Sequence, residues 1–318
     1  MKPFAPSRQR SRGAAVLRQR QSGAAILIAL VVVTVVATMA AAMFVRQDGT
    51  IAAETARRQA AQARWILRGA LDWTRIILRE DARTSGVDHL GEPWALQVAP
   101  ISLKSFLAVG EQADDAVLDA QIVGNIIDLQ GRFNLRNLAS EGQVKPEDVE
   151  GFKRMLEALG VNNAASVADS TAASVAAVVK GQGVAPQQPI GLMSGLEATE
   201  RERVAASVTW LPTRTPVNVN TASAAVLVSA VPGLSFSDAK GLIERRASTY
   251  FRDAQDFLGR VPGLKLTGTA NIASNTQYFE VTGALLWGDM TIEQRAIVQR
   301  AGLQVRVVSI AYGPTMPN

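Results

Sequence analysis

One uncharged stretch near the N-terminus limits what this chain can fold into. From Ala24 to Val45 there are 22 residues without a charge, and only Thr34 and Thr38 among them are polar. At about 1.5 Å per residue, a helix of this length is about 33 Å long, which is enough to cross a hydrocarbon core of roughly 30 Å. The segment therefore predicts a transmembrane helix, and its uninterrupted length argues against a core helix of a soluble domain.

The charges in front of this segment predict its orientation. Residues 1–23 contain no acidic residue and six basic ones: Lys2, Arg8, Arg10, Arg12, Arg18 and Arg20. Because basic flanks stay on the cytoplasmic side, we expect a cytoplasmic N-terminus and an exported C-terminal body. A secretory signal peptide is the alternative, since Ala40-Ala41-Ala42 fits the small-residue rule for cleavage after Ala42.

The net charge of the chain is a property of this leader. The chain has 33 Lys and Arg against 28 Asp and Glu, a balance of +5, and a pI near 9.8. Subtracting the six basic residues of the leader leaves 27 against 28, so residues 24–318 carry −1. Non-specific affinity for nucleic acid grows with the number of phosphates neutralised, and a body at −1 gives little reason to expect it.

The near absence of two residue types excludes several kinds of site. The chain has no cysteine, which excludes disulfides, thiolate nucleophiles and cysteine-ligated zinc or iron–sulfur sites. Its one histidine, His89, follows Asp88 in a loop expected over residues 82–100. No Gly-x-Ser-x-Gly turn accompanies this pair, so we expect a solvated loop histidine and no catalytic centre.

The helical pattern continues beyond the membrane segment. From Thr50 to Asp81 there is no proline, alanine is abundant, and apolar residues recur at helical spacing. One face is expected to lie on a folded domain, and it consists of Trp65, Gly69, Trp73 and Ile76, joined by Ile66, Ala70 and Ile77. The pattern predicts one helix of about 55 residues from Ala24 to about Arg79, a continuity that a cleaved signal peptide does not need.

The body combines strand-like segments at both ends with a helical section between them. Residues 121–129 alternate and are rich in Ile and Val, and residues 278–284 and 303–310 also alternate. We expect the two late segments to pair with the early one. Residues 145–159 predict a helix, because Pro146 suits a first turn and Gly160 suits a C-terminal cap.

A helical hairpin is expected within this section. Asn220 or Thr221 would cap a first helix ending at Ala230, and residues 238–246 form the second. The turn between them is Val231-Pro232-Gly233-Leu234. This resembles a helix-hairpin-helix, a unit that often holds a DNA phosphate. Here the second turn glycine is missing and acidic residues lie among the few basic ones, so a structural role is favoured.

Two groups of residues carry a resemblance to a known family. Ser22-Gly23 followed by Ala24-Ala25-Ile26-Leu27-Ile28 resembles a type IV prepilin cleavage site. Residues 127–135 (IDLQGRFNL), 91–94 (GEPW) and the helical section 218–246 are similar to the K-type minor pseudopilins of type II secretion systems. The resemblance covers nearly the whole chain after the leader.

The resemblance implies specific processing. It implies that prepilin peptidase cleaves between Gly23 and Ala24 and methylates the new N-terminus on Ala24. Pilins typically have a glutamate at the fifth mature position, where this chain has Ile28. A charge inside the membrane costs a few kcal/mol or more unless it is paired, and a subunit that is first in the fibre has no subunit above it to pair with. The apolar Ile28 matches the K-type exception and implies a tip position.

The expected fold is α+β: a type IV pilin-like fold, with a long N-terminal helix on a small antiparallel sheet and a large inserted all-α domain with helix-hairpin-helix or SAM-like elements. The expected divisions are a cleaved leader over 1–23, a transmembrane helix over 24–45, the periplasmic half of the helix over 46–82, a β domain formed by 83–135 and 270–318, and an inserted α domain over 136–269. The structural hairpin residues are Asn220, Thr221, Pro232, Gly233 and Leu234.

The expected function is that of a minor pseudopilin at the tip of the periplasmic pseudopilus, anchored by one helix in the inner membrane and helping to start its assembly. It is not expected to be an enzyme. The expected partners are the I-type and J-type minor pseudopilins, prepilin peptidase, and a secreted substrate or the outer-membrane secretin, with no nucleic acid. No cofactor is certain; the resemblance allows calcium, whose ligands the sequence does not identify. The alternatives are a membrane-anchored DNA-binding protein of competence type and a periplasmic enzyme behind a signal peptide.

Overall fold

The computed structural model describes residues 22–96, 98–107, 119–261, 263–288, 290–313 and 316–317. The chain divides into two units, residues 1–59 and 60–318, and each is described by itself. Most of the basic leader lies outside the described residues.

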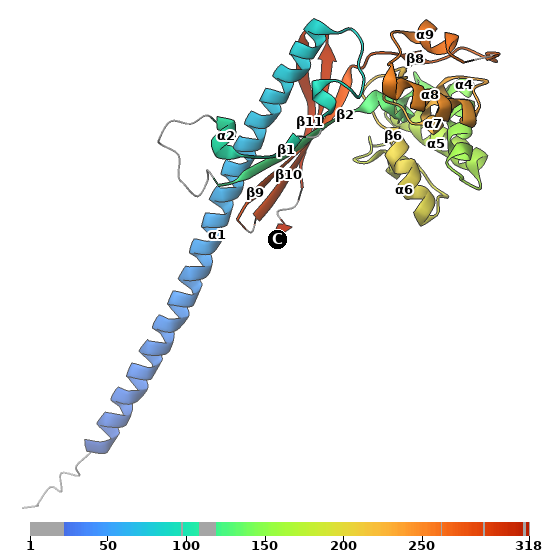
Figure 1. The fold of residues 1–318 in the computed structure, drawn as a ribbon. Coiled ribbons are helices and arrows are strands. Elements are labelled where there is room, and N and C mark those ends of the chain that lie inside the picture. The colour runs from blue at the N-terminus through green and yellow to red at the C-terminus, as the bar shows by residue number, and fades with distance from the viewer. Residues whose placement is uncertain are drawn as a thin grey trace, which may run out of the picture. The chain divides into compact units, whose positions relative to one another are not determined.

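The long helix α1 runs from Ser22 to Thr84, 63 residues, and thus begins and ends beyond the expected limits. The first unit consists of its N-terminal part. In the second unit, α1 lies along the sheet with Ala63, Leu67, Leu71 and Leu78 buried (Figure 1). Their spacing of four and seven residues keeps them on one side of the helix.

The sheet against α1 is antiparallel and has the order β1-β2-β9-β10-β11. The bounds are β1 Val98–Ser102, β2 Gln121–Asp128, β9 Tyr278–Trp287, β10 Met290–Ala301 and β11 Gln304–Tyr312; β12, Met316–Pro317, pairs with β10. As expected, β2 and β9 pair directly although about 150 residues separate them, with Ile126 opposite Val281. The second late segment was expected to pair with β2, which is wrong, because β11 pairs with β10.

The sequence pattern did not predict β10, because polar residues interrupt the apolar alternation of this strand. Its inward positions include Gln294 and Arg300, which are 4% and 7% exposed, alongside the apolar Ile292, Ala296 and Val298. A half-buried strand is predicted from apolar residues at alternate positions, and two of the five buried positions of β10 are polar, which weakens that pattern. The strand β1, within the expected loop, was also missed.

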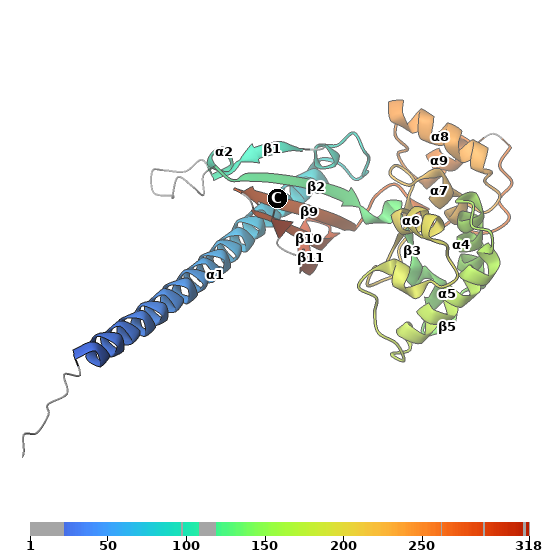
Figure 2. The ribbon, with the colours of Figure 1, turned by 90° about the horizontal axis from the view of Figure 1, so that it is seen from below.

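Between β2 and β9 the chain forms a mainly helical section (Figure 2). Its helices are α4 Pro146–Ala158, α5 Ala164–Val179, α6 Ala198–Ser207, α7 Ala224–Ala230, α8 Phe236–Ser248 and α9 Ala254–Gly259. Two-residue strands form three small pairs: β3 Phe133–Asn134 with β6 Val208–Thr209, β4 Ala139–Ser140 with β5 Gln143–Val144, and β7 Val217–Asn218 with β8 Ile272–Ala273. The short helix α2, Leu103–Leu107, follows β1.

The helical section has its own hydrophobic core, which extends beyond the expected limits of 136 and 269. Phe133 belongs to this core and Ile272 packs against it. The helix α4 starts at Pro146, and the backbone of Gly160 beyond its end has φ +73°, as its turn role requires. The pairing of β7 with β8 brings the two ends of the hairpin region, residues 219–271, together. The insertion leaves the β2–β9 ladder intact, because Asp128 at its start lies opposite Phe279 at its end.

Candidate functional site

The first candidate site is the apolar N-terminal part of α1. Residues Ala24–Gln47 form a helical segment of mean hydropathy 2.7, long enough to cross a membrane, with none of it buried in the protein. The hydroxyls of Thr34 and Thr38 donate to the carbonyls of Val31 and Val35, at 2.8 and 2.9 Å. Because the helix satisfies its own polar groups, the segment suits a hydrocarbon environment.

Both expected processing residues lie in the first turn of this helix. Gly23 and Ala24 both have helical backbone, and the leader before Ser22 lies outside the described residues. The expected tip residue, Ile28, is 65% exposed on the same helix. The position at which a typical pilin has a glutamate therefore carries an exposed, apolar side chain in this helix.

The C-terminal part of α1 presents an aromatic face to solvent. The expectation that Trp65, Trp73 and Ile76 lie against the domain is wrong, because they are 75%, 49% and 50% exposed, and Gly69 is exposed as well. Ile66, Ala70 and Ile77, expected on the same face, do pack against the core. The helix is apolar on more than one side, and the leucine face at Leu67 and Leu71 fits the sheet. Large exposed apolar side chains that cluster on one element are typical of an interaction surface.

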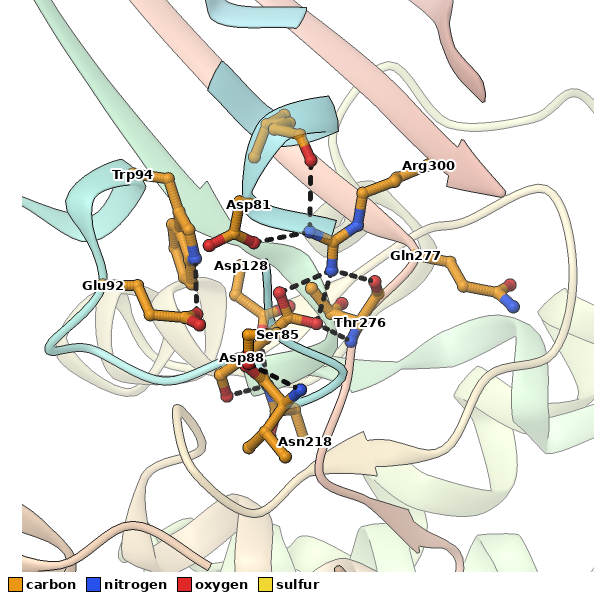
Figure 3. Close-up of polar contacts among 12 residues, drawn as sticks. Asp81, Ser85, Asp88, Glu92, Trp94, Asp128, Asn218, Thr276, Gln277 and Arg300 are labelled. Carbon is orange, nitrogen blue, oxygen red and sulfur yellow. Dashed lines mark hydrogen bonds and ion pairs between the residues drawn. The ribbon is translucent and has the colours of Figure 1, made fainter. Parts of the chain in front are cut away.

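A buried charge network joins α1, the following loop and the sheet (Figure 3). The guanidinium of Arg300 on β10 donates to Asp81 of α1 at 2.7 Å and to both carboxylate oxygens of Asp88 at 2.5 and 2.6 Å. It also donates to the carbonyls of Leu78 and Thr276. The three charged side chains are 2–8% exposed, so both ion pairs are shielded from water.

Burial shifts the proton equilibria of both carboxyl groups in this network. Desolvation raises the pKa of Asp88 to about 6, although Arg300 and the Thr276 N–H oppose the shift. Desolvation, helped by the charge of Glu92, also raises the pKa of Asp81. The network therefore holds two acids whose ionised forms depend on one arginine.

A second buried carboxylate joins the sheet to the helical hairpin. Asp128, at the end of β2, accepts hydrogen bonds from Asn218 Nδ2 at 2.8 Å and from Thr221 Oγ1 at 2.6 Å. Its own side chain also caps the next turn by accepting from the Gln130 N–H. Burial raises the pKa of Asp128. Asn218 donates as well to the carbonyl of Asp88, so the two networks are connected.

Asn220 or Thr221 was expected to cap α7, and this is wrong. Ser223 is the N-cap, and its Oγ accepts from the Val226 N–H. The Asn220 amide instead bonds both backbone groups of Phe251, at 2.8 Å each. Asn, Thr and Ser are all good caps, and the tertiary contacts of the first two leave the third for the helix.

The hairpin turn packs against its own chain. Gly233 has φ +90°, and a side chain there would meet the carbonyl oxygen of Lys265 at 2.4 Å. Leu234 is buried and Pro232 is half-buried. The basic residues of α8 also have local contacts: Lys240 lies over the ring of Phe236, and Arg245 donates to the carbonyl of Arg260. These contacts pack the turn and α8 within the helical section.

The lone histidine does not form a dyad with its acidic neighbour. The ring of His89 stacks on Tyr250 with centroids 4.2 Å apart, and Nδ1 accepts from the Gly91 N–H. Asp88 is bound to Arg300 instead. His89 was expected to be a solvated loop residue; it lies in the loop, and its ring also stacks on the helical section.

Among the described residues, one group of acids has spacing suited to a metal ion: Asp81, Asp88 and Glu92. These residues do not fit calcium, which takes six to eight oxygen ligands. Arg300 already neutralises the two aspartates, and Oε2 of Glu92 accepts from the indole N–H of Trp94 at 2.8 Å and from the backbone of His89.

Comparisons with known proteins agree on one family. A family model described as type II secretion system protein K matches residues 217–278. A Pseudomonas aeruginosa protein named type II secretion system protein K is 30% identical over 304 residues, which cover 86% of this chain and 87% of the relative. A Klebsiella pneumoniae protein of the same name is 26% identical over 334 residues, covering 93% and 98%.

A solved structure shares the fold. It is a chain of the GspK–GspI–GspJ complex from the type 2 secretion system of enterotoxigenic Escherichia coli, with a TM-score of 0.61 at 18% identity. The match covers 81% of this chain and 98% of that chain. The expected pilin-like α+β fold class is therefore confirmed.

Proposed function

This chain belongs to the protein K family of type II secretion systems, and from that premise we propose that it forms the tip of the pseudopilus. As a member of this family it is a minor pseudopilin, membrane-anchored through an N-terminal apolar helix and carrying a soluble body. The family is one of secretion pseudopilins rather than known enzymes. What the proposal adds is the place of this subunit in the fibre and its role in starting assembly.

The observation that carries the tip proposal is the apolar fifth position of the mature chain. Ile28 lies in a span of mean hydropathy 2.7 and has no charge to offer to the N-terminal amine of a neighbouring subunit. An unpaired glutamate at the top of a fibre would cost a few kcal/mol in the membrane, and an isoleucine removes that cost. The bulk of the helical section between β2 and β9 supports the same place, because it would obstruct a further subunit above it.

The same proposal includes processing by prepilin peptidase between Gly23 and Ala24 and methylation of Ala24. Both residues lie in the first turn of α1, so the peptidase would have to unwind that turn. Glycine lowers the helix propensity by about 1 kcal/mol relative to alanine, which makes Gly23 a favourable place for such opening. The proposed location is the inner membrane, with the body in the periplasm.

The proposed partners are the I-type and J-type minor pseudopilins, since a structurally similar chain is found in a complex with GspI and GspJ. The exposed side chains of Trp65, Trp73 and Ile76 on α1 are a suitable surface for packing against neighbouring α1 helices. Contacts with the secretin or with secreted substrate belong to the proposal as well, without residues assigned to them.

The tip proposal is tested by fibre initiation in cells that express the complete secretion system. We expect Ile28→Glu to reduce the number of pseudopili started per cell and to allow this chain to appear inside fibres, whereas the matched Ile28→Leu variant behaves like the parent. If Ile28→Glu leaves initiation and position unchanged, the missing charge does not set the tip position.

Processing is tested by mass spectrometry of the chain from cells with prepilin peptidase. We expect a mature protein that begins at methylated Ala24. Gly23→Ala should retain the leader, and Gly13→Ala, a glycine in the leader away from the junction, should be processed normally. A mature N-terminus at any other residue refutes this part of the proposal.

A further inference from the structure

A cavity of about 470 Å³ lies between the loop that follows α1 and the C-terminal end of α8. Its lining includes His89 and Leu90 from the loop, Ile243 and Arg246 from α8, and Tyr250 just after α8. None of the lining residues is acidic. A hollow with basic and apolar walls and no carboxylate of its own favours an organic anion as its ligand.

Arg246 presents an unused pair of donors at this cavity. Its Nη1 donates to the carbonyls of Val219 and Ala222, at 2.8 and 2.6 Å, which fixes the guanidinium in place. Its Nε and Nη2 make no hydrogen bond within the described residues, and neither is fully buried. The N–H groups of Nε and Nη2 point the same way and form the side-on fork that matches the two oxygens of a carboxylate.

The charge of Arg246 is also unmatched. No carboxylate of the described residues forms an ion pair with it, and partial burial lowers its pKa to about 10 because the guanidinium is desolvated without a counter-ion. At neutral pH it remains a cation. The acidic residues of the loop that contributes His89 have other partners, since Asp88 binds Arg300 and Glu92 binds the Trp94 indole.

His89 and Tyr250 form an aromatic wall of the same cavity. Their rings stack with an interplanar angle of 9°. Because Nδ1 of His89 accepts from the Gly91 N–H, a neutral ring carries its proton on Nε2, which makes that atom a further donor. The wall supplies a flat apolar surface and one N–H group to the cavity that Arg246 also lines.

We propose that this cavity is a carboxylate-binding site, in which the Nε and Nη2 groups of Arg246 hold the carboxylate side-on and the His89–Tyr250 pair and Ile243 cover its apolar part. Recognition by a fork of two donors requires two acceptor oxygens in one plane, which an amide or an alcohol lacks. The carboxylate has two sources with the same chemistry: a free small organic acid, or an acidic side chain of a neighbouring protein.

The test uses benzoate as the probe and benzamide as a neutral ligand of the same shape, with the full chain in detergent. Isothermal titration calorimetry at constant ionic strength should give a measurable Kd for benzoate and a value at least about tenfold weaker for benzamide, because the amide offers only one acceptor. Equal affinities for the two probes overturn the proposal.

Arg246→Lys is the informative substitution, since it keeps the positive charge and removes the fork. We expect benzoate affinity to fall at least about tenfold, whereas Arg245→Lys on the same helix leaves it unchanged. If Arg246→Lys impairs folding, Tyr250→Ala takes its place: Tyr250 is 42% exposed, so the fold should tolerate its loss. Removing this wall should weaken benzoate several-fold, and an unchanged Kd in the folded variant overturns the proposal.

A second arm distinguishes the two sources of the carboxylate. The benzoate titration is repeated on this chain in complex with its I-type and J-type partners. Loss of binding in the complex, restored on dissociation, identifies an acidic side chain of a partner as the occupant. Binding that persists in the complex identifies a free organic acid. This arm rests on the proposed partnership, whereas the titration of the chain alone does not.

Discussion

Replacing Arg300 by methionine is the sharpest test of how this protein is held together. Arg300 lies on β10, and its guanidinium donates to Asp81, Asp88 and two backbone carbonyls while stacking on Phe279 with 4.9 Å between the guanidinium carbon and the ring centre. Methionine keeps much of the apolar volume of the side chain. It leaves two buried acids without their cation.

The size of the effect follows from burial. The three side chains of the network are at most 8% exposed, so water screens the stranded charges little. Removing one partner of a buried ion pair costs about 3–5 kcal/mol. For a body of this size, each kcal/mol lowers the Tm by roughly 2–4 °C, so the expected decrease is about 6–20 °C.

The assay is thermal and urea unfolding of the full chain in detergent, followed by circular dichroism. The matched control is Arg295→Met on the same strand. Its side chain is 64% exposed and lies 3.9 Å from Glu280, so its loss should cost at most about 1 kcal/mol. Equal destabilisation by the two substitutions contradicts the role of the buried network.

The pH dependence gives a second check. Burial raises the pKa of Asp88 from 3.8 to about 6, so the folded chain binds this proton more tightly than the unfolded chain. This group therefore removes stability as the pH rises from about 4 to about 6 and adds no further change above that. Without Arg300 the pKa should rise further, and protonation then neutralises the stranded acid.

For that reason the Arg300→Met defect should be largest at pH 8 and smaller at pH 5. The double variant Arg300→Met/Asp88→Asn should recover part of the lost stability at pH 8, because the second change removes one stranded charge. A defect that is the same at both pH values, or a double variant whose losses simply add, refutes the electrostatic explanation.

Three further predictions concern the helices and the hairpin. Ser223→Ala should lower the free energy of unfolding by about 1 kcal/mol in urea titrations, because it removes the α7 cap; no change would mean that another residue takes over. Gly233→Ala should lower the free energy of unfolding by roughly 1–3 kcal/mol, since the φ of Gly233 is +90° and a Cβ would meet a carbonyl oxygen at 2.4 Å. Gly69→Ala, in open space on α1, should leave the free energy of unfolding unchanged or raise it by up to about 1 kcal/mol. A larger loss of stability for Gly69→Ala than for Gly233→Ala contradicts these contacts. Hydrogen bonds from the Arg252 backbone and the Arg260 side chain lower the pKa of Asp256 to about 2. The contribution of Asp256 to stability is therefore complete above about pH 4 and is lost as the pH falls through 2. Asp256→Asn should remove this part of the acid unfolding curve, and an unchanged curve contradicts the prediction.

The sequence carried much of the architecture because the strongest patterns are local. The membrane segment, the continuity of α1 and the α4 limits follow from hydropathy, helical periodicity and the conformational preferences of proline and glycine. The pairing of β2 with β9 was also within reach, because both strands keep an apolar alternation. Each of these patterns lies within a short stretch of the chain, even where the two stretches that pair, β2 and β9, are far apart in sequence.

Other features failed where a tertiary contact overrides a local preference. The face of α1 that lies on the sheet is set by which side chains fit the sheet, so Leu67 and Leu71 are buried and Trp65 is not. Asn220 and Thr221 are good caps by composition, yet Phe251 and Asp128 take their hydrogen bonds. The pattern of neighbouring residues in a sequence does not show these distant partners, which compete for the same side chains.

By itself the sequence determined that this is a membrane-anchored chain with a basic leader, an uncharged helix bearing Ile28, and an α+β body, because hydrophobicity and periodicity are properties of neighbouring residues. Only the tertiary structure decided that Arg300 neutralises Asp81 and Asp88. It alone also decided that Arg246, with two donors that bond to none of the described residues, lines the same cavity as His89 and Tyr250. Those groups are up to 219 residues apart. The physical reason they act together is burial, because removal from water makes each charge depend on whichever partner the fold brings within hydrogen-bond distance.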